Sequence, residues 1–136
     1  MIIIDDRLSL DALAGRRDRI GAARIDVVAT TWGFHYRLLR ALADDDRVGQ
    51  LSRATPVALR DRVKEPPAST LVVLDPRDIT ARAAELAVRH HLNLLAAELV
   101  AAAVDHGARV VLSAANVGRS WPAVLEAEGV ELQVVA

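Results

Sequence analysis

The stretch "LNLLAAELVAAAVDHGARVVLSAANVG", residues 92–118, predicts a helix that leads at once into a buried strand. Asn93 is a favourable N-cap and Gly107 a favourable C-terminal stop, so we expect the helix over 93–106. The next run, 109–113, is nearly all apolar and β-branched, which is typical of a parallel strand covered on both faces. A helix followed directly by such a strand is the repeating unit of α/β proteins.

The same alternation extends over the rest of the chain. Apolar, β-branched runs predict four more strands, at 2–5, 26–30, 70–74 and 131–135. Helical patterns lie between the strands, at 9–14, 32–43, 47–63 with an interruption at Pro56, 78–90 and 121–128. This order predicts one domain over residues 1–136, a three-layer α/β/α domain with a five-stranded parallel sheet.

Composition limits the class of protein. The 136 residues are 52% hydrophobic, which suits one globular domain with its own core. The formal net charge of −1 gives no overall preference for nucleic acid or anionic membrane. Cysteine is absent, which excludes disulfides and thiolate metal sites. No apolar run approaches the roughly 20 residues of a membrane helix, so we expect a cytoplasmic protein with no membrane partner.

Polar side chains follow the predicted strands. The opening "MIIIDD" places Asp5 and Asp6 after a buried strand, and adjacent carboxylates at such a position often serve metal or phosphate chemistry. Ligands of parallel α/β sheets bind outside the carboxyl ends of the strands. Five more residues fall at those ends, and they are Thr30, Thr31, Asp75, Ser113 and Asn116.

This element order, Asp5 and the 92–118 stretch resemble the PIN domain, the fold of the VapC-type ribonuclease toxins. The stretch "VVATTWGFHYRLLRAL", residues 27–42, is similar to the second strand and following helix of that family. The resemblance covers essentially the whole chain. It implies a site of three or four carboxylates that hold Mg²⁺ or Mn²⁺, where the metal activates water for RNA cleavage.

The chain departs from the family pattern at most of the acidic positions. Asp5 matches the first acid, whereas Arg37 stands at the second and Ala96 at the third. Ala114 and Asn116 occupy the places of the fourth. Two other acids, Asp6 and Asp75, could substitute, but Glu98 lies about 200° around its helix from Ala96 and should face elsewhere.

We therefore expect an eroded nuclease site with weak Mg²⁺ or Mn²⁺ binding or none. Asp5 and Asp6 are the candidate catalytic residues, and Asp5 is the candidate metal ligand. The expected function is a non-catalytic or weakly catalytic module that binds RNA or protein. The candidate binding residues are Arg37, Asn116, Ser113, Asp75 and Thr31.

Two alternatives stay open. The first is an active VapC-type Mg²⁺-dependent ribonuclease toxin whose site is rebuilt on Asp5, Asp6 and Asp75. The second is a degenerate receiver-like signalling domain, which the paired acids and the Asp75 of "LVVLDP" resemble. The long gap from Asp6 to Asp75 counts against the receiver, as does the lack of a lysine after the fifth strand, since Lys64 is the only one.

The family resemblance and two local motifs predict which partners this chain could bind. "TTWGFHY", residues 30–36, supplies either a nucleobase platform with Arg37 and Arg40 or, more simply, packing and a dimer contact. "AGRRDR", residues 14–19, offers an RNA-facing rim or a solvated mixed surface. The family implies a homodimer and a small antitoxin, whose arginine can enter the acidic site; here Arg37 could take that place within the chain itself.

Overall fold

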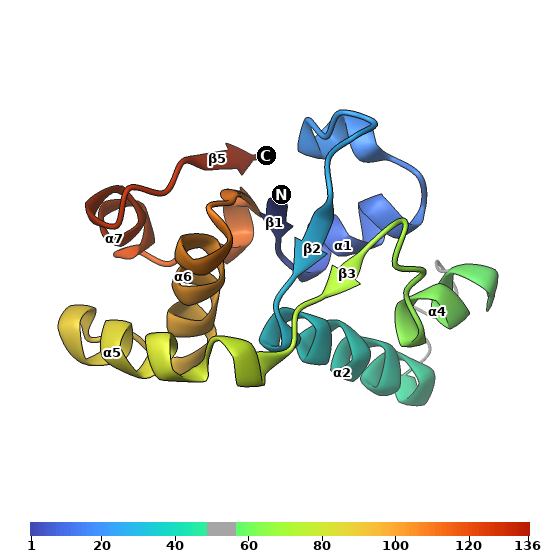
Figure 1. Ribbon diagram of the computed structural model, residues 1–136. Helices are drawn as coiled ribbons and strands as arrows, with labels where there is room; N and C mark the ends of the chain where they lie inside the picture. The colour runs from blue at the N-terminus through green and yellow to red at the C-terminus, as the bar shows by residue number, and fades with distance from the viewer. Residues whose placement is uncertain (49–56) are drawn as a thin grey trace.

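The computed structural model describes residues 1–48 and 57–136. Its centre is a sheet of five strands, β1 (Ile2–Ile4), β2 (Val28–Thr30), β3 (Val72–Val73), β4 (Arg109–Ser113) and β5 (Leu132–Val135). All neighbouring strands are parallel, in the order β3-β2-β1-β4-β5 (Figure 1). The five-stranded parallel sheet predicted from the sequence is confirmed.

Helices connect successive strands. They are α1 (Asp6–Leu13), α2 (Trp32–Val48), α4 (Val57–Lys64), α5 (Thr80–His90), α6 (Leu94–His106) and α7 (Trp121–Ala127). Three short 3₁₀ turns lie between them, at η1 (Arg17–Ile20), η2 (Pro76–Asp78) and η3 (Ala114–Asn116). In the part of the chain described here, none of the helices has the length and apolar character needed to cross a membrane.

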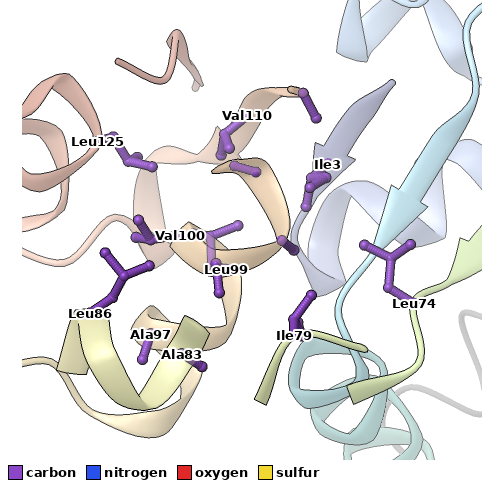
Figure 2. Close-up of a cluster of buried hydrophobic side chains, with 14 of the residues drawn as sticks. Ile3, Leu74, Ile79, Ala83, Leu86, Ala97, Leu99, Val100, Val110 and Leu125 are labelled. Carbon is purple, nitrogen blue, oxygen red and sulfur yellow. The ribbon is translucent and has the colours of Figure 1, made fainter. Parts of the chain in front are cut away.

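Side chains of the sheet alternate between two buried clusters. Ile3 and Val110 pack with residues of α5, α6 and α7 (Figure 2). Ile2, Ile4 and Val111 point the other way, into a cluster built with α1, α2 and α4. This alternation is the period of two expected of a strand. Helices therefore cover both faces of the sheet, and the predicted three-layer architecture is confirmed.

The strand order indicates where a ligand would bind to this sheet. The chain builds β1, β2 and β3 outward in one direction and then returns to place β4 on the other side of β1. Such a reversal is where ligands bind in open α/β sheets, outside the carboxyl ends of the strands. The order also counts against the receiver-like alternative, because receiver domains have the flavodoxin-like order 2-1-3-4-5.

The helix expected over 93–106 is observed as Leu94–His106. The Asn93 side chain accepts a hydrogen bond from the Ala96 N–H at 2.9 Å, and Gly107 ends the helix with a left-handed φ of 59°. Residues 96–103 are all buried. Their small side chains let α6 lie close to both the sheet and α5.

Several predicted boundaries were wrong. The first helix begins at Asp6 rather than at residue 9, because β1 already ends at Ile4 and Asp5 caps the helix. The third strand covers only Val72–Val73. The second helix runs on to Val48 instead of ending at residue 43. Of the helix expected over 47–63, the described residues from 57 onward form α4. The expected interruption at Pro56 lies outside the described residues.

Candidate functional site at the carboxyl ends of β1 and β4

Asp5 lies where the central strand turns into α1. Its Oδ1 accepts a hydrogen bond from the Leu8 N–H at 2.9 Å, which is the N-cap contact of α1. The Ser9 hydroxyl donates to the Asp5 carbonyl oxygen at 2.7 Å. The strand end, the cap and the first helical turn together fix the carboxylate in one orientation.

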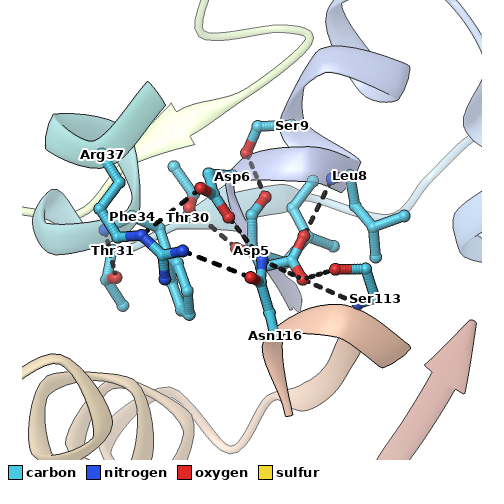
Figure 3. Close-up of polar contacts among 11 residues, drawn as sticks. Asp5, Asp6, Leu8, Ser9, Thr30, Thr31, Phe34, Arg37, Ser113 and Asn116 are labelled. Atoms are coloured by element: carbon cyan, nitrogen blue, oxygen red, sulfur yellow. Dashed lines mark hydrogen bonds and ion pairs between the residues drawn. The ribbon is translucent and has the colours of Figure 1, made fainter. Parts of the chain in front are cut away.

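The second oxygen of Asp5 faces the end of β4. Its Oδ2 accepts from the Ser113 N–H at 2.7 Å, from the Ser113 hydroxyl at 2.5 Å and from Asn116 Nδ2 at 3.0 Å (Figure 3). Asp5 is 0% exposed. A buried carboxylate is costly unless its oxygens are hydrogen-bonded, and four donors meet that need here. We call Asp5, Ser113 and Asn116 the Asp5 network.

Asp6 joins the same group of residues. Asn116 Nδ2 donates to Asp6 Oδ1 at 2.6 Å as well as to Asp5. Successive residues of a strand point to opposite faces, but both acids reach one amide because the strand has ended before them. Asp5 and Asp6 therefore share one partner, the Asn116 amide, which is a donor rather than a further acid.

Arg37 reaches this group from α2. Its Nε lies 3.6 Å from Asp6 Oδ2, and its Nη2 donates to Asn116 Oδ1 at 3.3 Å. The guanidinium carbon also lies 5.8 Å from the centre of the Phe34 ring, within the range of a cation–π contact. A cation thus pairs with Asp6 at the position where the family resemblance expects a second metal-binding acid.

These residues do not fit a bound Mg²⁺ or Mn²⁺. Such ions need about six oxygen ligands, most of them from carboxylates, carbonyls and water. Here an amide nitrogen lies between the two carboxylates, and a guanidinium faces Asp6. Within residues 1–48 and 57–136, no three acidic or histidine side chains are grouped so that they could hold a metal ion.

The other predicted site residues take different positions. The Thr31 hydroxyl accepts from the Phe34 N–H at 3.4 Å at the start of α2. Asp75 follows the edge strand β3, caps η2 and forms a 2.6 Å ion pair with Arg77. The hydrogen bonds from Arg77 lower the pKa of the Asp75 carboxyl. Asp75 does not join the Asp5 network, because β2 separates β3 from β1.

Glu98 has a role that the sequence analysis did not assign. Its side chain is buried, and its Oε1 accepts the Gly33 N–H at 2.7 Å in the first turn of α2. A carboxylate at this helix end also interacts favourably with the helix dipole. A Cβ on Gly33 would lie 3.1 Å from the same oxygen, so glycine allows this close approach. The available signal was an acid in the apolar part of α6, where every other residue from Leu94 to Val104 is Ala, Leu or Val.

The aromatic residues of "TTWGFHY" do not form one platform. Phe34 is buried and packs edge-on against Trp121, with ring centres 6.4 Å apart. Trp32 and Tyr36 stack at 5.6 Å and are each about half exposed. These two line an apolar hollow of about 310 Å³ between α2 and α6, together with Leu94. A second hollow of about 270 Å³ lies between α5 and α6, and Leu94 lines that one too.

Comparison with solved structures shows a shared fold. A structure of the PAE2754 protein from Pyrobaculum aerophilum aligns with a TM-score of 0.58 and 24% identity, over 90% of this chain and 84% of that chain. A toxin–antitoxin complex from Klebsiella pneumoniae aligns with a TM-score of 0.51 and 19% identity, over 82% of this chain and 84% of that chain. No protein-family model and no curated protein matches the sequence.

Proposed function

We propose that this chain is a divergent PIN-like domain that works as a binding module, with little or no metal-dependent ribonuclease activity. The fold shared with a toxin–antitoxin complex supports the PIN-like part of the proposal. The environment of Asp5 is the observation that supports the other part, which is the lack of metal-dependent ribonuclease activity. The two oxygens of Asp5 are already occupied by four hydrogen-bond donors, three of which come from Ser113 and Asn116.

The chemical reason lies in the charge balance of the site. Metal-assisted hydrolysis needs carboxylate oxygens that are free to bind a cation, which then activates water. In this chain Asn116 and Arg37 supply the positive dipole and the positive charge that a cation would bring. The acids are neutralised by the protein itself, and Arg37 takes within the chain the place that the resemblance gives to an antitoxin arginine.

Calorimetric titration of Mn²⁺ tests this proposal, with and without a short single-stranded RNA. We expect no stoichiometric binding by the wild-type protein and no difference in Asp6→Ala. Asp6→Ala is preferred to a substitution of Asp5, because it leaves the buried donors around Asp5 paired. Asp75→Ala is the matched control, since Asp75 is an acid outside the network. Tight one-to-one binding that is lost in Asp6→Ala but kept in Asp75→Ala would contradict the proposal.

One observation favours the alternative of an active toxin with a rearranged site. Asp5 and Asp6 converge on a single amide nitrogen, so a shift of Asn116 would bring two carboxylates toward one cation. The variant Arg37→Glu tests this alternative, because it replaces the cation by an acid at the position of the family's second carboxylate. Mn²⁺-dependent RNA cleavage by wild type, or growth arrest on its expression, would establish the alternative. Cleavage gained only in Arg37→Glu would instead support an eroded site.

We further propose a homodimer through the exposed apolar surface of α2, α5 and α6. Leu94 is 73% exposed and stands between the two apolar hollows. A two-fold contact uses the same patch on both copies, so a projecting side chain beside a hollow is self-complementary. In such a pair, Leu94 of each copy would enter a hollow of the other. The alternative occupant is a small antitoxin-like protein, as in the Klebsiella pneumoniae complex.

A further inference from the structure

A third hollow lies beside the Asp5 network, on the α1 side of the sheet. It has a volume of about 430 Å³, within the range of roughly 300–1,000 Å³ that is common for ligand pockets. Its walls come from α1, the loop around η1, the start of η3 and Ala136 after the edge strand β5. Three arginines line it, and they are Arg7, Arg16 and Arg19.

A buried carboxylate holds two of these arginines in position. The Asp11 side chain is only 9% exposed. Its Oδ1 accepts from Arg16 Nε at 2.8 Å and lies 2.7 Å from Arg16 Nη2, and its Oδ2 lies 3.2 Å from Arg19 Nη1. The two arginine side chains are about half exposed. Asp11 therefore fixes the inner edges of both guanidinium groups and leaves their outer edges toward the hollow and solvent.

Both guanidinium groups keep donors for a second anion. Each has five N–H groups, and Asp11 engages only some of them. An arginine that is already positioned loses less conformational entropy when it binds a ligand.

Arg7 adds a third positive charge. It lies one helical turn before Asp11 on α1 and is exposed. No ion pair or hydrogen bond of its side chain is found within residues 1–48 and 57–136. Three guanidinium groups thus face one side-chain carboxylate, that of Asp11. The side chains that line the hollow carry excess positive charge.

The hollow also shares a wall with the Asp5 network. Ser113 lines it and donates its hydroxyl to Asp5. Ala114 and Ala115, which follow in η3, are exposed and have small side chains that leave the entrance open. A ligand held by the three arginines would therefore lie next to the carboxyl ends of β1 and β4, where the crevice of this fold is located.

We propose that the hollow of Arg7, Arg16 and Arg19 is an anion site that binds a phosphate group of a larger ligand. Guanidinium groups match the oxygens of phosphate through pairs of parallel hydrogen bonds, and several of them together suit its high charge. The phosphate can belong to a mononucleotide or to the backbone of single-stranded RNA. The site uses none of the acids on which the proposed function rests, so the two can fail separately.

Isothermal titration calorimetry tests the site with three probes, which are inorganic phosphate, adenosine monophosphate and a single-stranded RNA hexamer. We expect saturable one-site binding by the wild-type protein. Arg7→Gln and Arg19→Gln should each weaken it about tenfold, since each removes a charged hydrogen-bonding partner. Arg82→Gln is the matched control, because Arg82 lies on α5, in the helical layer on the other face of the sheet, and pairs with Asp105. Circular dichroism checks that each variant is folded.

The probes distinguish the sources of the phosphate. If the hexamer binds more tightly than the monophosphate, and Arg7→Gln weakens the binding of both, the site binds the phosphates of an RNA backbone. If the monophosphate binds as tightly as the hexamer, the ligand is a small nucleotide. Absence of saturable binding for all three probes would overturn the proposal. Equal weakening in Arg82→Gln and Arg7→Gln would overturn it too, because it would indicate attraction by charge alone.

Discussion

The Asp5 side chain is buried, and both oxygens of its carboxylate accept hydrogen bonds. Removing one member of a buried hydrogen-bonded group lowers the free energy of unfolding by more than the net contribution of the lost hydrogen bonds. The donors that remain are left without acceptors and away from water. For this chain those donors belong to Leu8, Ser113 and Asn116, which lie on three separate elements.

The first prediction concerns Asp5→Ala. We expect it to lower the free energy of unfolding by about 3 kcal/mol, because it leaves several buried donors unpaired. Urea unfolding followed by circular dichroism measures the change. Asp75→Ala serves as the comparison, since that acid lies on the surface and pairs with Arg77. Equal losses in the two variants would show that the Asp5 network adds no special stability.

The second prediction concerns His35. Its side chain is buried, and its Nδ1 has no hydrogen-bond partner among residues 1–48 and 57–136. Burial lowers the pKa of the imidazole. The unfolded chain then binds the proton more readily than the folded one. Stability should fall as the pH drops below about 6.5, the ordinary pKa of histidine.

Urea unfolding of wild type and His35→Phe between pH 7.5 and pH 5 measures this effect. Phenylalanine has no proton to bind, so the difference between the two proteins should shift in favour of the variant as the pH falls. The pair between His90 and Glu128 is present in both proteins and cancels in the difference. A difference that stays constant over this range would contradict the prediction.

Single residues show which parts of the site could be predicted from the sequence. Asp5, Ser113 and Asn116 were predicted to lie at one sheet edge, because each follows a strand, and the structure does bring them together. The contact between Glu98 and Gly33 could not be predicted in this way. It joins residues 65 positions apart on two helices, and helical periodicity says which face a residue takes but not which neighbour it meets.

At the scale of elements, the first turn of α2 depends on a side chain of another helix. Gly33 donates its N–H to Glu98 of α6, and Leu95 of the same helix lies 3.0 Å from the position of an added Cβ. The start of α2 and the middle of α6 are therefore held together. Arg37 and Phe34 follow within the next turn, so this contact also sets how α2 presents Arg37 to Asp6.

The third prediction tests this contact with Glu98→Ala. Loss of the buried acceptor should lower the free energy of unfolding by about 2 kcal/mol, although alanine is the better helix former. Thermal and urea unfolding measure the change. Glu85→Ala on α5 is the matched control, because the Glu85 side chain is 64% exposed. An equal or smaller loss in Glu98→Ala than in the control would contradict the role given to Glu98.

The elements also show what sequence patterns could and could not give. All five strands were located, since continuous apolar runs mark strands buried on both faces. The start of α1 was missed by three residues, because Asp5, which caps the helix, was assigned to the preceding strand. Strand order was beyond reach, because local patterns carry no information on which strands become neighbours.

At the scale of the whole molecule, the exposed apolar side chains gather unevenly. Trp32, Tyr36 and Leu94 line the hollows between α2, α5 and α6, whereas Ile25 lies in the loop before β2 and lines neither hollow. Isolated apolar side chains on a surface are ordinary, but a cluster marks an interaction site. The proposed homodimer would cover this cluster and leave the arginine-lined hollow near β5 open.

The fourth prediction is that the chain of 14.7 kDa forms a dimer in solution through this surface. Light scattering after size-exclusion chromatography should give twice the mass of the chain. Leu94→Glu should shift the protein to the monomer, because it places a charge in an apolar contact. Ile25→Ser, which removes an apolar side chain that is 92% exposed and lines neither hollow, should leave the dimer intact.

A monomer at every concentration tested would assign the surface to a different partner. The antitoxin-like alternative would then take precedence, with the Klebsiella pneumoniae complex as its precedent. A dimer that persists in Leu94→Glu would mean that the contact lies on another face.

The position of β1 has a consequence for how this protein emerges from the ribosome. β1 is the first strand of the sequence and the central strand of the sheet, and its neighbour β4 begins only at Arg109. At the usual pace of translation, roughly 5–20 s separate the synthesis of the two strands. During that interval β1 can pair with β2. Its other neighbour, β4, and the Ser113 and Asn116 donors to the Asp5 carboxylate have not yet been synthesised. The nascent chain therefore completes its fold late, and a transcript broken before β4 yields a product whose central strand keeps an open edge that invites aggregation.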